Sequence, residues 1–302
     1  MSTEAHGVLA PTVVFASDYG LADPYVGLCH LAIARVGAAL GARIDVVDLC
    51  HVAPAFDVGA NAALLRDALP WIPAGSVVLA VVDPGVGTDR AGVVVRVDGS
   101  VAATPADGAD TPGVAPLYLV GPDNGLLTAA GGEHVRRAWR IQEVARPSPA
   151  AGGPAPATFD GRDVFAPMAA RLAVDADAAL DGLEPMGVDE LVAHRLPAAT
   201  AHPGRVETQV VRVDGFGNVL LSALGSAIAQ AGWQRGQTVS VDTAQGVWHA
   251  TVAVAFAELG QGRLGLLADA FGRLQLAIDR GDASQRLGLG VGSRLAVATA
   301  EA

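Results

Sequence analysis

The fold is organised around one segment of the sequence, Val77-Val78-Leu79-Ala80-Val81-Val82-Asp83-Pro84-Gly85-Val86-Gly87-Thr88-Asp89-Arg90. Its six consecutive apolar residues predict a strand that is buried on both faces. Asp83 follows this strand directly, and Arg90 comes seven residues after Asp83, beyond a Pro-Gly-x-Gly turn. Open α/β sheets bind ligands just past the carboxyl ends of their strands, so both residues are candidates for a site. In isolation, Asp83 would be interpreted as a turn cap and Arg90 as a solvated side chain.

The first ninety residues alternate between strand and helix patterns. Strands are predicted at 12–16, 44–49 and 77–82. Helices are predicted from Pro24 to about Val36, with Asp23 as N-cap, and from Val58 to Leu69, with Asp57 as N-cap. Crossover helices of this length predict a parallel sheet with right-handed connections.

Each of these three strands ends in polar residues. They are Asp18 after the first strand, Asp48 and His51 after the second, and Asp83 after the third. Three such ends on one edge of a sheet predict the rim of a pocket. Singly, the residues are unremarkable, because an Asp at a strand end is typically a helix cap and a His there is typically a satisfied core or turn residue.

The rest of the chain divides into two parts. Further strands are expected at 92–97 and 117–120, with a loop at 104–116, a flexible connection at 147–156 and a helix opening near Asp160 and running to about Leu172. After about residue 190 the pattern changes to short strands with turns, at 207–213, 217–221, 238–241, 247–255, 264–267, 274–278 and 294–298. This spacing indicates a small β-barrel or sandwich. We therefore predict an α/β domain at 1–190, a linker at 191–204 and a β domain at 205–302.

Composition excludes several classes of partner. The 302 residues are 51% hydrophobic and 17% charged, with a net charge of -11 and no Lys, which argues against nucleic acid and anionic membranes as partners. Cys29 and Cys50 can form neither a disulfide framework nor a metal-ligand pattern, and we expect both to be buried and inert. No signal pattern or membrane-spanning apolar run is present, so a cytoplasmic protein is expected.

Several motifs gain meaning only together and in order. They are S-D-Y-G-x-x-D-P-Y-V-G, D-x-C-H, V-V-D-P-G-V-G-T-x-R, P-D-N-G-L-L-T, T-F-x-G-R-D-x-F-A-P and D-x-F-G-N-V. Taken one by one, Phe216-Gly217-Asn218 would be a strand entry and Arg162-Asp163 a structural ion pair. As a set, the motifs resemble the S-adenosylmethionine hydroxide adenosyltransferase family, which is related to the fluorinases and chlorinases. The resemblance extends from Asp18 to Leu274.

The resemblance implies a fold, an assembly and a reaction. The family has an amino-terminal Rossmann-like α/β domain and a carboxyl-terminal β-barrel. It forms homotrimers in which each active site lies between the first domain of one subunit and the barrel of the next. Water or hydroxide attacks the ribose 5′ carbon of S-adenosyl-L-methionine, which yields adenosine and L-methionine. No metal or other cofactor is implied, because the sulfonium is already a good leaving group.

The same resemblance assigns roles to residues of the α/β domain. Asp18 matches the carboxylate that binds the ribose hydroxyls, for which two acceptor oxygens suit two adjacent donors. Asp23 matches a contact to the methionine moiety, and Phe56 stands where relatives have an aromatic residue near the ribose. Asp83 and Arg90 match two members of the family's water-handling Asp-Arg-His set.

The resemblance also assigns roles in the barrel. Asp214 matches a carboxylate that holds the methionine ammonium group. Phe216 and Asn218 match residues around the adenine. Asp269 and Ala270 stand where relatives have Asn-Ser, at a contact to the methionine or the adenine.

The main departure from the family pattern is Asp160, where the hydrolases have His. A neutral imidazole accepts a proton near pH 7, whereas an ordinary Asp, with a pKa of about 3.9, is a poor base. Asp160 could orient water while activation depends on Asp83, with the two carboxylates titrating as a coupled pair. Alternatively, the site is slow or uses another nucleophile. In a further reading, Asp160 only caps the helix at Arg162.

Two other functions remain open at this point. A halogenase needs a dehydrated halide pocket without a nearby fixed negative charge, which Asp83 and Asp160 disfavour. A non-catalytic binder of S-adenosylmethionine or adenosine is compatible with the change at position 160. The reaction products distinguish hydrolysis, halogenation and binding alone.

Overall fold

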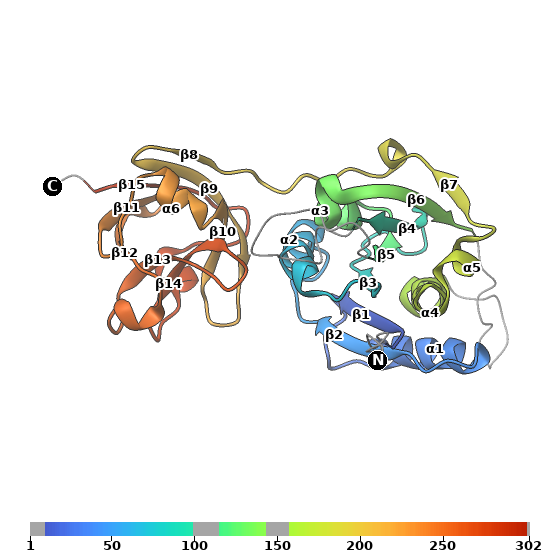
Figure 1. Cartoon of the computed structure of the whole chain (residues 1–302). Helices are drawn as coiled ribbons and strands as arrows, with labels where there is room; N and C mark the ends of the chain where they lie inside the picture. The colour runs from blue at the N-terminus through green and yellow to red at the C-terminus, as the bar shows by residue number, and fades with distance from the viewer. Residues whose placement is uncertain (1–9, 99–114, 143–156, 301–302) are drawn as a thin grey trace, which may run out of the picture. The chain divides into compact units, whose positions relative to one another are not determined.

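The computed structural model describes residues 10–98, 115–142 and 157–300. The predicted connection at 147–156 and most of the predicted loop at 104–116 lie outside these residues. The chain separates into two compact units between Arg195 and Leu196 (Figure 1). The first is an α/β unit and the second a barrel, so the predicted fold class is confirmed.

The α/β unit is built on a seven-stranded sheet with the order β2-β1-β3-β5-β4-β6-β7. In chain order the strands are β1 (Thr12–Ser17), β2 (Asp45–Cys50), β3 (Val77–Val81), β4 (Gly92–Val97), β5 (Leu117–Pro122), β6 (Val135–Ile141) and β7 (Glu184–Met186). The strands β2, β1, β3 and β5 are parallel, as predicted for the first three, whereas β4, β6 and β7 pair antiparallel. All five residues of β3 are buried, which confirms the interpretation of the organising segment.

Helices cover both faces of this sheet. They are α1 (Tyr25–Ala39), α2 (Val58–Ala68), α3 (Leu126–Gly131), α4 (Ala166–Val174) and α5 (Ala176–Leu180), with short turns η1 (Leu69–Trp71), η2 (Gly132–His134), η3 (Gly161–Phe165) and η4 (Val188–Glu190). Helix α1 packs with α4, and α2 packs with α3 (Figure 1). Apolar side chains of β1 and β3 form one core with α1 and α4.

Two predicted helix caps have different outcomes. Asp57 caps α2, because its Oδ1 accepts a hydrogen bond of 2.9 Å from the Ala60 amide. The prediction for Asp23 is wrong: α1 begins at Tyr25, Pro24 takes the N-cap position and no side chain caps this end. Pro24 adopts φ -76° and ψ 3°, so the helix starts one residue later than predicted and leaves Asp23 exposed outside the first turn.

The second unit is a closed barrel, which decides between the two predicted alternatives. Its strands are β8 (Thr200–His202), β9 (Arg205–Val213), β10 (Val219–Leu224), β11 (Thr238–Thr243), β12 (Gly246–Val252), β13 (Leu264–Ala268), β14 (Arg273–Ile278) and β15 (Arg294–Thr299). They follow the order β10-β14-β13-β12-β11-β15-β9-β8, and pairing of β10 with β9 closes the sheet. All seven strands predicted here are confirmed, with shifted ends. Strand β8, within the range predicted as linker, pairs with β9.

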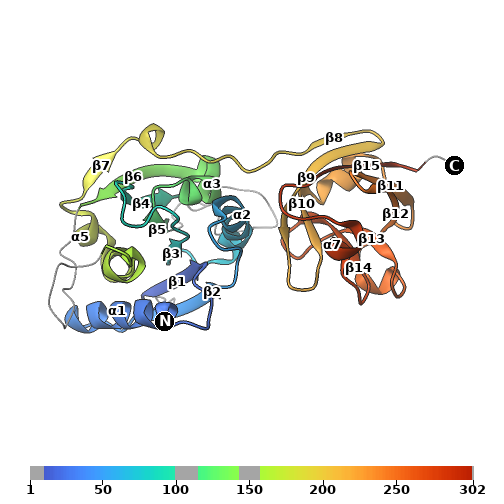
Figure 2. The same ribbon diagram turned by 180° about the vertical axis from the view of Figure 1, so that it is seen from behind.

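The barrel interior is filled by the inward side chains of its strands, including Val206, Val210, Leu221 and Leu266. This unit also contains three short helices, α6 (Ser226–Gln230), η5 (Phe256–Glu258) and α7 (Ala283–Leu287). Helix α7 contacts β14 (Figure 2). Because the interior is packed, a ligand of this unit must bind on the outer face or at the rim.

Candidate functional site

Asp83, Arg90 and Asp160 form a buried cluster at the carboxyl end of β3. Arg90 donates from Nε to Asp83 Oδ1 (3.1 Å) and from Nη2 to Asp83 Oδ2 (2.6 Å). The same Nη2 donates to Asp160 Oδ2 at 2.9 Å. The three side chains are only 9% (Arg90), 6% (Asp83) and 8% (Asp160) exposed. The structure therefore brings together two residues of the organising segment and one that lies seventy positions later.

Local geometry holds Arg90 in this position. Its Nη1 donates to the Ala91 carbonyl at 2.7 Å, and its guanidinium carbon lies 5.3 Å from the centre of the Phe165 ring. The preceding turn needs Gly87, whose φ of 79° is left-handed and whose Cβ, if present, would approach the Ala157 carbonyl to 2.9 Å. Gly87 thus allows the chain to fold back and return Arg90 to Asp83.

The cluster perturbs the protonation of Asp83. Burial raises the pKa of this carboxyl, the charge and hydrogen bonds of Arg90 oppose that rise, and the nearby Asp160 adds to it, so that the pKa remains above its ordinary value. With both carboxylates ionised, the three side chains carry one net negative charge in a buried space. A carboxylate with a raised pKa is a better proton acceptor than an ordinary Asp.

Asp160 does not act as a helix cap, so the capping interpretation is wrong. The helix opens with the π-helical turn η3 at Gly161–Phe165 and continues as α4. Asp160 itself has helical backbone angles, and its side chain makes no capping hydrogen bond. Its carboxylate instead bonds to Arg90, because the π-helical turn directs it toward the end of β3. Arg162 and Asp163, in the same turn, form the predicted ion pair, with contacts of 2.6 and 2.8 Å.

Tyr19 is a member of this region that sequence reasoning missed. A Cβ on Gly161 would overlap the Tyr19 hydroxyl, so the glycine next to Asp160 leaves the space that this phenol occupies. Burial, followed by the charges of neighbouring groups that include Asp18, Asp83 and Asp160, raises the pKa of Tyr19 well above its usual range. The phenol therefore stays protonated. The only signal in the sequence was its place after Asp18 in the Ser-Asp-Tyr-Gly motif.

Asp18 lies at the end of β1, as predicted. Its Oδ2 accepts a hydrogen bond of 2.8 Å from the Phe56 amide. Phe56 adopts a left-handed φ of 62°, rare for a residue with a side chain, and its ring is 71% exposed. Among the described residues, no other group bonds to the Asp18 carboxylate and none bonds to Asp23. Both acids thus have oxygens available to a ligand.

The end of the second predicted strand is structural. His51 is buried, its Nδ1 lies 2.7 Å from Ser17 Oγ, and its Nε2 lies 3.0 Å from Asp48 Oδ1. The same Asp48 oxygen contacts His30 at 2.8 Å. Burial raises the pKa of Asp48, but the hydrogen bonds from His51 and His30 together outweigh burial and lower it. The interpretation of His51 as a satisfied core residue is confirmed.

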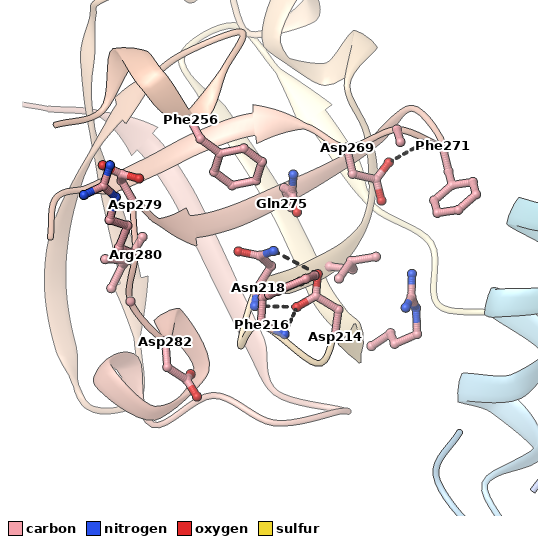
Figure 3. A pocket seen from close by; sticks show the side chains of 15 residues that line it. Asp214, Phe216, Asn218, Phe256, Asp269, Phe271, Gln275, Asp279, Arg280 and Asp282 are labelled. Atoms are coloured by element: carbon pink, nitrogen blue, oxygen red, sulfur yellow. Dashed lines mark hydrogen bonds between the residues drawn. The ribbon is translucent and has the colours of Figure 1, made fainter. Parts of the chain in front are cut away.

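The barrel unit contains a cavity of about 770 Å³ on its outer side (Figure 3). Asp214, at the end of β9, accepts hydrogen bonds of 2.9 Å at Oδ1 from the amides of Phe216 and Asn218. Its Oδ2 accepts a bond of 2.8 Å from Asn218 Nδ2. These bonds shape the turn so that Asn218 is buried while the Phe216 ring is 82% exposed at the cavity.

Asp269 and Ala270 line the same cavity from the hairpin between β13 and β14. Asp269 Oδ1 accepts bonds of 2.8 Å from the amides of Phe271 and Arg273, which fixes the hairpin. The cavity therefore collects all five residues that the sequence assigned to the barrel. Two further phenyl rings, Phe256 and Phe271, were not foreseen, because nothing in the local sequence separates them from ordinary surface residues.

Other sequence predictions concern metals, cysteines and membranes. Within the ranges described above, no group of three or more His, Cys, Asp or Glu could hold a metal ion. Cys29 is buried as expected, and burial raises the pKa of its thiol to about 12. The expectation that Cys50 is buried is wrong, because this residue is only partly buried. In the same part of the chain, no helix combines the length and hydropathy needed to cross a membrane.

Comparison with known proteins identifies the family of this chain. The model of the SAM hydroxide adenosyltransferase N-terminal domain matches residues 13–116 and 112–180, and that of the C-terminal domain matches 208–296. A protein of Salinispora tropica named (R)-S-adenosyl-L-methionine hydrolase is 36% identical, covering 96% of this chain and 99% of that protein. One of the same name from Thermus thermophilus is 39% identical, covering 92% and 95%.

Two less similar proteins also match most of this chain. A fluorinase of Actinopolyspora mzabensis is 27% identical, covering 76% of this chain and 77% of that protein. An uncharacterized conserved protein from Thermotoga maritima has a crystal structure that matches with a TM-score of 0.76 and 29% identity, covering 95% of this chain and 99% of that one. The chain therefore belongs to the SAM hydroxide adenosyltransferase family.

Proposed function

We propose that this protein hydrolyses S-adenosyl-L-methionine to adenosine and L-methionine by attack of water at the ribose 5′ carbon. The observation that carries the proposal is the buried Asp83–Arg90–Asp160 cluster at the end of β3. The names of the relatives from Salinispora tropica and Thermus thermophilus support it. Those names specify the (R) epimer at sulfur, so we propose that epimer as the preferred substrate.

The reaction requires few groups from the protein. The water oxygen forms a bond to C5′ while the C5′–sulfur bond breaks, and the bonding electron pair returns to sulfur. The sulfonium thus becomes the neutral thioether of methionine, which leaves without protonation. The water must lose one proton, and it must lie in line with the bond that breaks. Positioning of this water therefore provides a large part of the rate.

Asp83 is the proposed proton acceptor. Its pKa is raised mainly by burial, which makes it a stronger base, and Arg90 holds both of its oxygens in a fixed orientation. Asp160, in place of the family His, fixes Arg90 from the other side and orients the water. The protonated phenol of Tyr19 supplies a further donor close to this cluster.

The charge of this cluster favours hydrolysis over halogenation. Two carboxylates and one guanidinium leave a net negative charge in a buried space, which attracts the cationic sulfonium. A halide next to Asp83 and Asp160 would be repelled in the same low-dielectric environment. The similarity to a fluorinase therefore does not favour the halogenase reaction for this chain.

The remaining residues are assigned to substrate contacts. Asp18 would bind the ribose hydroxyls, with Phe56 near the ribose, and Asp23 would contact the methionine moiety. In the barrel, Phe216 and Asn218 would contact the adenine, and the exposed phenyl rings around the cavity support stacking on a base. Asp214 would hold the methionine ammonium, and Asp269 with Ala270 would complete this contact.

We propose further that the protein is a homotrimer, in which each substrate contacts the α/β domain of one subunit and the barrel of the next. The family resemblance supports this assembly, and light scattering of the purified protein tests it. A cytoplasmic location is also proposed, supported by two free cysteines within the described residues.

The decisive experiment is chromatography of products after incubation with each sulfonium epimer, with and without chloride. Adenosine and methionine in equal amounts support hydrolysis. A 5′-chloronucleoside would indicate halogenation, and unchanged ligand with measurable affinity would indicate a binding protein. Asp83→Asn should abolish adenosine release while affinity changes by less than about tenfold, or roughly 1.4 kcal/mol. Undiminished turnover in this variant would remove Asp83 from the mechanism.

A further inference from the structure

Arg212 lies in the barrel cavity and has no partner among the residues that the structure describes. It lies on β9, two residues before Asp214, and both side chains line the cavity. Its Nε is buried and has no hydrogen-bond partner, and no described residue forms an ion pair with its guanidinium. A buried guanidinium nitrogen without an acceptor is costly, so such an arrangement is typical of a group that completes its bonds with a ligand.

Among the described residues, the two nearby carboxylates of the cavity, Asp214 and Asp269, form no ion pair with Arg212. Both oxygens of Asp214 accept hydrogen bonds from its own turn. Asp269 Oδ1 accepts two amide bonds of its hairpin, while its Oδ2 is buried without a partner. Figure 3 shows Asp214 and Asp269 on the same side of the cavity. One cavity therefore presents a cation and acidic oxygens that do not bond to each other.

Strand register places Arg212 within this surface. Arg212 pairs with Leu220 on β10, and Leu220 pairs with Gln275 on β14, so the three residues form one row across the sheet. All three line the cavity. Leu220 and Gln275 carry no charge, so Arg212, two residues before Asp214, is the charged end of the row. The second arginine of the cavity, Arg280, lies next to Asp279 and away from Asp269 (Figure 3).

We propose that Arg212 binds the α-carboxylate of the substrate and is a specificity residue for its amino acid end. An α-amino acid carries a carboxylate and an ammonium group on one carbon, which is the complement of the separated charges in this cavity. The planar guanidinium fork suits a carboxylate, and Asp214 with Asp269 suit the ammonium. The inference rests on the proposed function and adds the group that distinguishes an amino acid from a simple amine.

The test compares two substrates that differ only in the carboxylate. S-adenosylmethionine and its decarboxylated analogue are given to the full-length protein and to Arg212→Gln, and kcat/KM for adenosine release is measured. Arg212→Gln should lose about 10- to 100-fold on S-adenosylmethionine, the range for one charge-assisted contact, and less than about threefold on the analogue. Arg212→Lys should recover part of the loss. The control Arg263→Gln, an exposed arginine outside the cavity, should leave both substrates unchanged.

A binding arm separates this inference from the proposed function. Calorimetry measures the affinity of L-methionine and of 3-(methylthio)propylamine, which lacks the carboxylate, and needs no turnover. If the wild-type protein releases no adenosine yet Arg212→Gln weakens only L-methionine, the hydrolase proposal fails and the Arg212 assignment stands. The assignment would be overturned if Arg212→Gln weakened the compound with the carboxylate and the compound without it equally, or weakened neither. It would also be overturned if the wild type did not bind L-methionine, or if Arg280→Gln, and not Arg212→Gln, lost the discrimination between these compounds.

Discussion

Replacement of Arg90 by Met should destabilise the α/β unit more than replacement of an exposed Arg by Met. The variant keeps the hydrophobic volume beside Phe165 but removes the cation shared by Asp83 and Asp160. Loss of one partner from a buried ion pair costs about 3–5 kcal/mol, because the remaining charge stays uncompensated. Arg90 Nη2 lies 2.6 and 2.9 Å from the two Oδ2 atoms. These oxygens are therefore at most about 5.5 Å apart and would repel by about 3 kcal/mol at an effective dielectric constant of 20.

The deficit should depend on pH in a defined direction. In the wild type, burial already raises the pKa of Asp83, and Arg90 opposes that rise. Without Arg90 the pKa of Asp83 rises further above its value in the unfolded chain. A carboxyl with a raised pKa contributes stability below the unfolded pKa and loses it as pH rises through the folded pKa. Arg90→Met should therefore be most unstable relative to the wild type near pH 7 and recover as pH falls toward 4.

Urea unfolding of the wild type and Arg90→Met at pH 7 and pH 4.5 measures both effects. Arg96→Met is the matched control. Arg96 lies on β4, the strand that follows Arg90 in the chain, and pairs with Asp98 at 3.0 Å, but both side chains are partly exposed. Loss of that pair should cost less than about 1 kcal/mol. The reasoning is refuted if Arg90→Met loses no more free energy of unfolding than Arg96→Met, or if its deficit is the same at both pH values.

Three further predictions concern activity and local stability. The rate of adenosine release should fall as pH drops through the raised pKa of Asp83. Asp160→Asn should shift this acid limb to lower pH, because removal of a neighbouring negative charge lowers the pKa of Asp83. A pH profile of kcat/KM that is the same in the variant and the wild type would contradict this prediction. Asp57→Ala should lower the free energy of unfolding by about 0.5–2 kcal/mol through loss of the α2 cap, with an unchanged KM, as urea titration and kinetics would show. Phe56→Gly should raise the free energy of unfolding by up to about 1 kcal/mol, because glycine adopts the left-handed backbone conformation without strain and removal of an exposed ring loses little packing. A lower stability of this variant in calorimetry would mean that the ring is packed.

Features that depend on neighbouring residues could be predicted from the sequence. The apolar run of β3 predicted a buried strand because a strand with both faces covered needs no polar alternation. Asp57 was identified as a cap because its bond reaches only three residues along the chain. Asp83 and Arg90 lie only seven residues apart, and the sequence identified both as candidates for one site, although their ion pair was seen only in the structure. The family motifs then placed these residues in a reaction.

Features that depend on distant partners were decided by the tertiary structure. Sequence periodicity does not reveal strand partners, so the antiparallel half of the first sheet and the β9–β10 pairing that closes the barrel emerged only there. Asp160 was open between cap and site residue because a π-helical turn and an arginine seventy positions away determine where its side chain lies. Arg212 drew no notice in the sequence, where an arginine in a strand is ordinary. Its Nε is buried without a hydrogen-bond partner among the described residues because three strands meet across one sheet, and this is a property of packing and not of residue order.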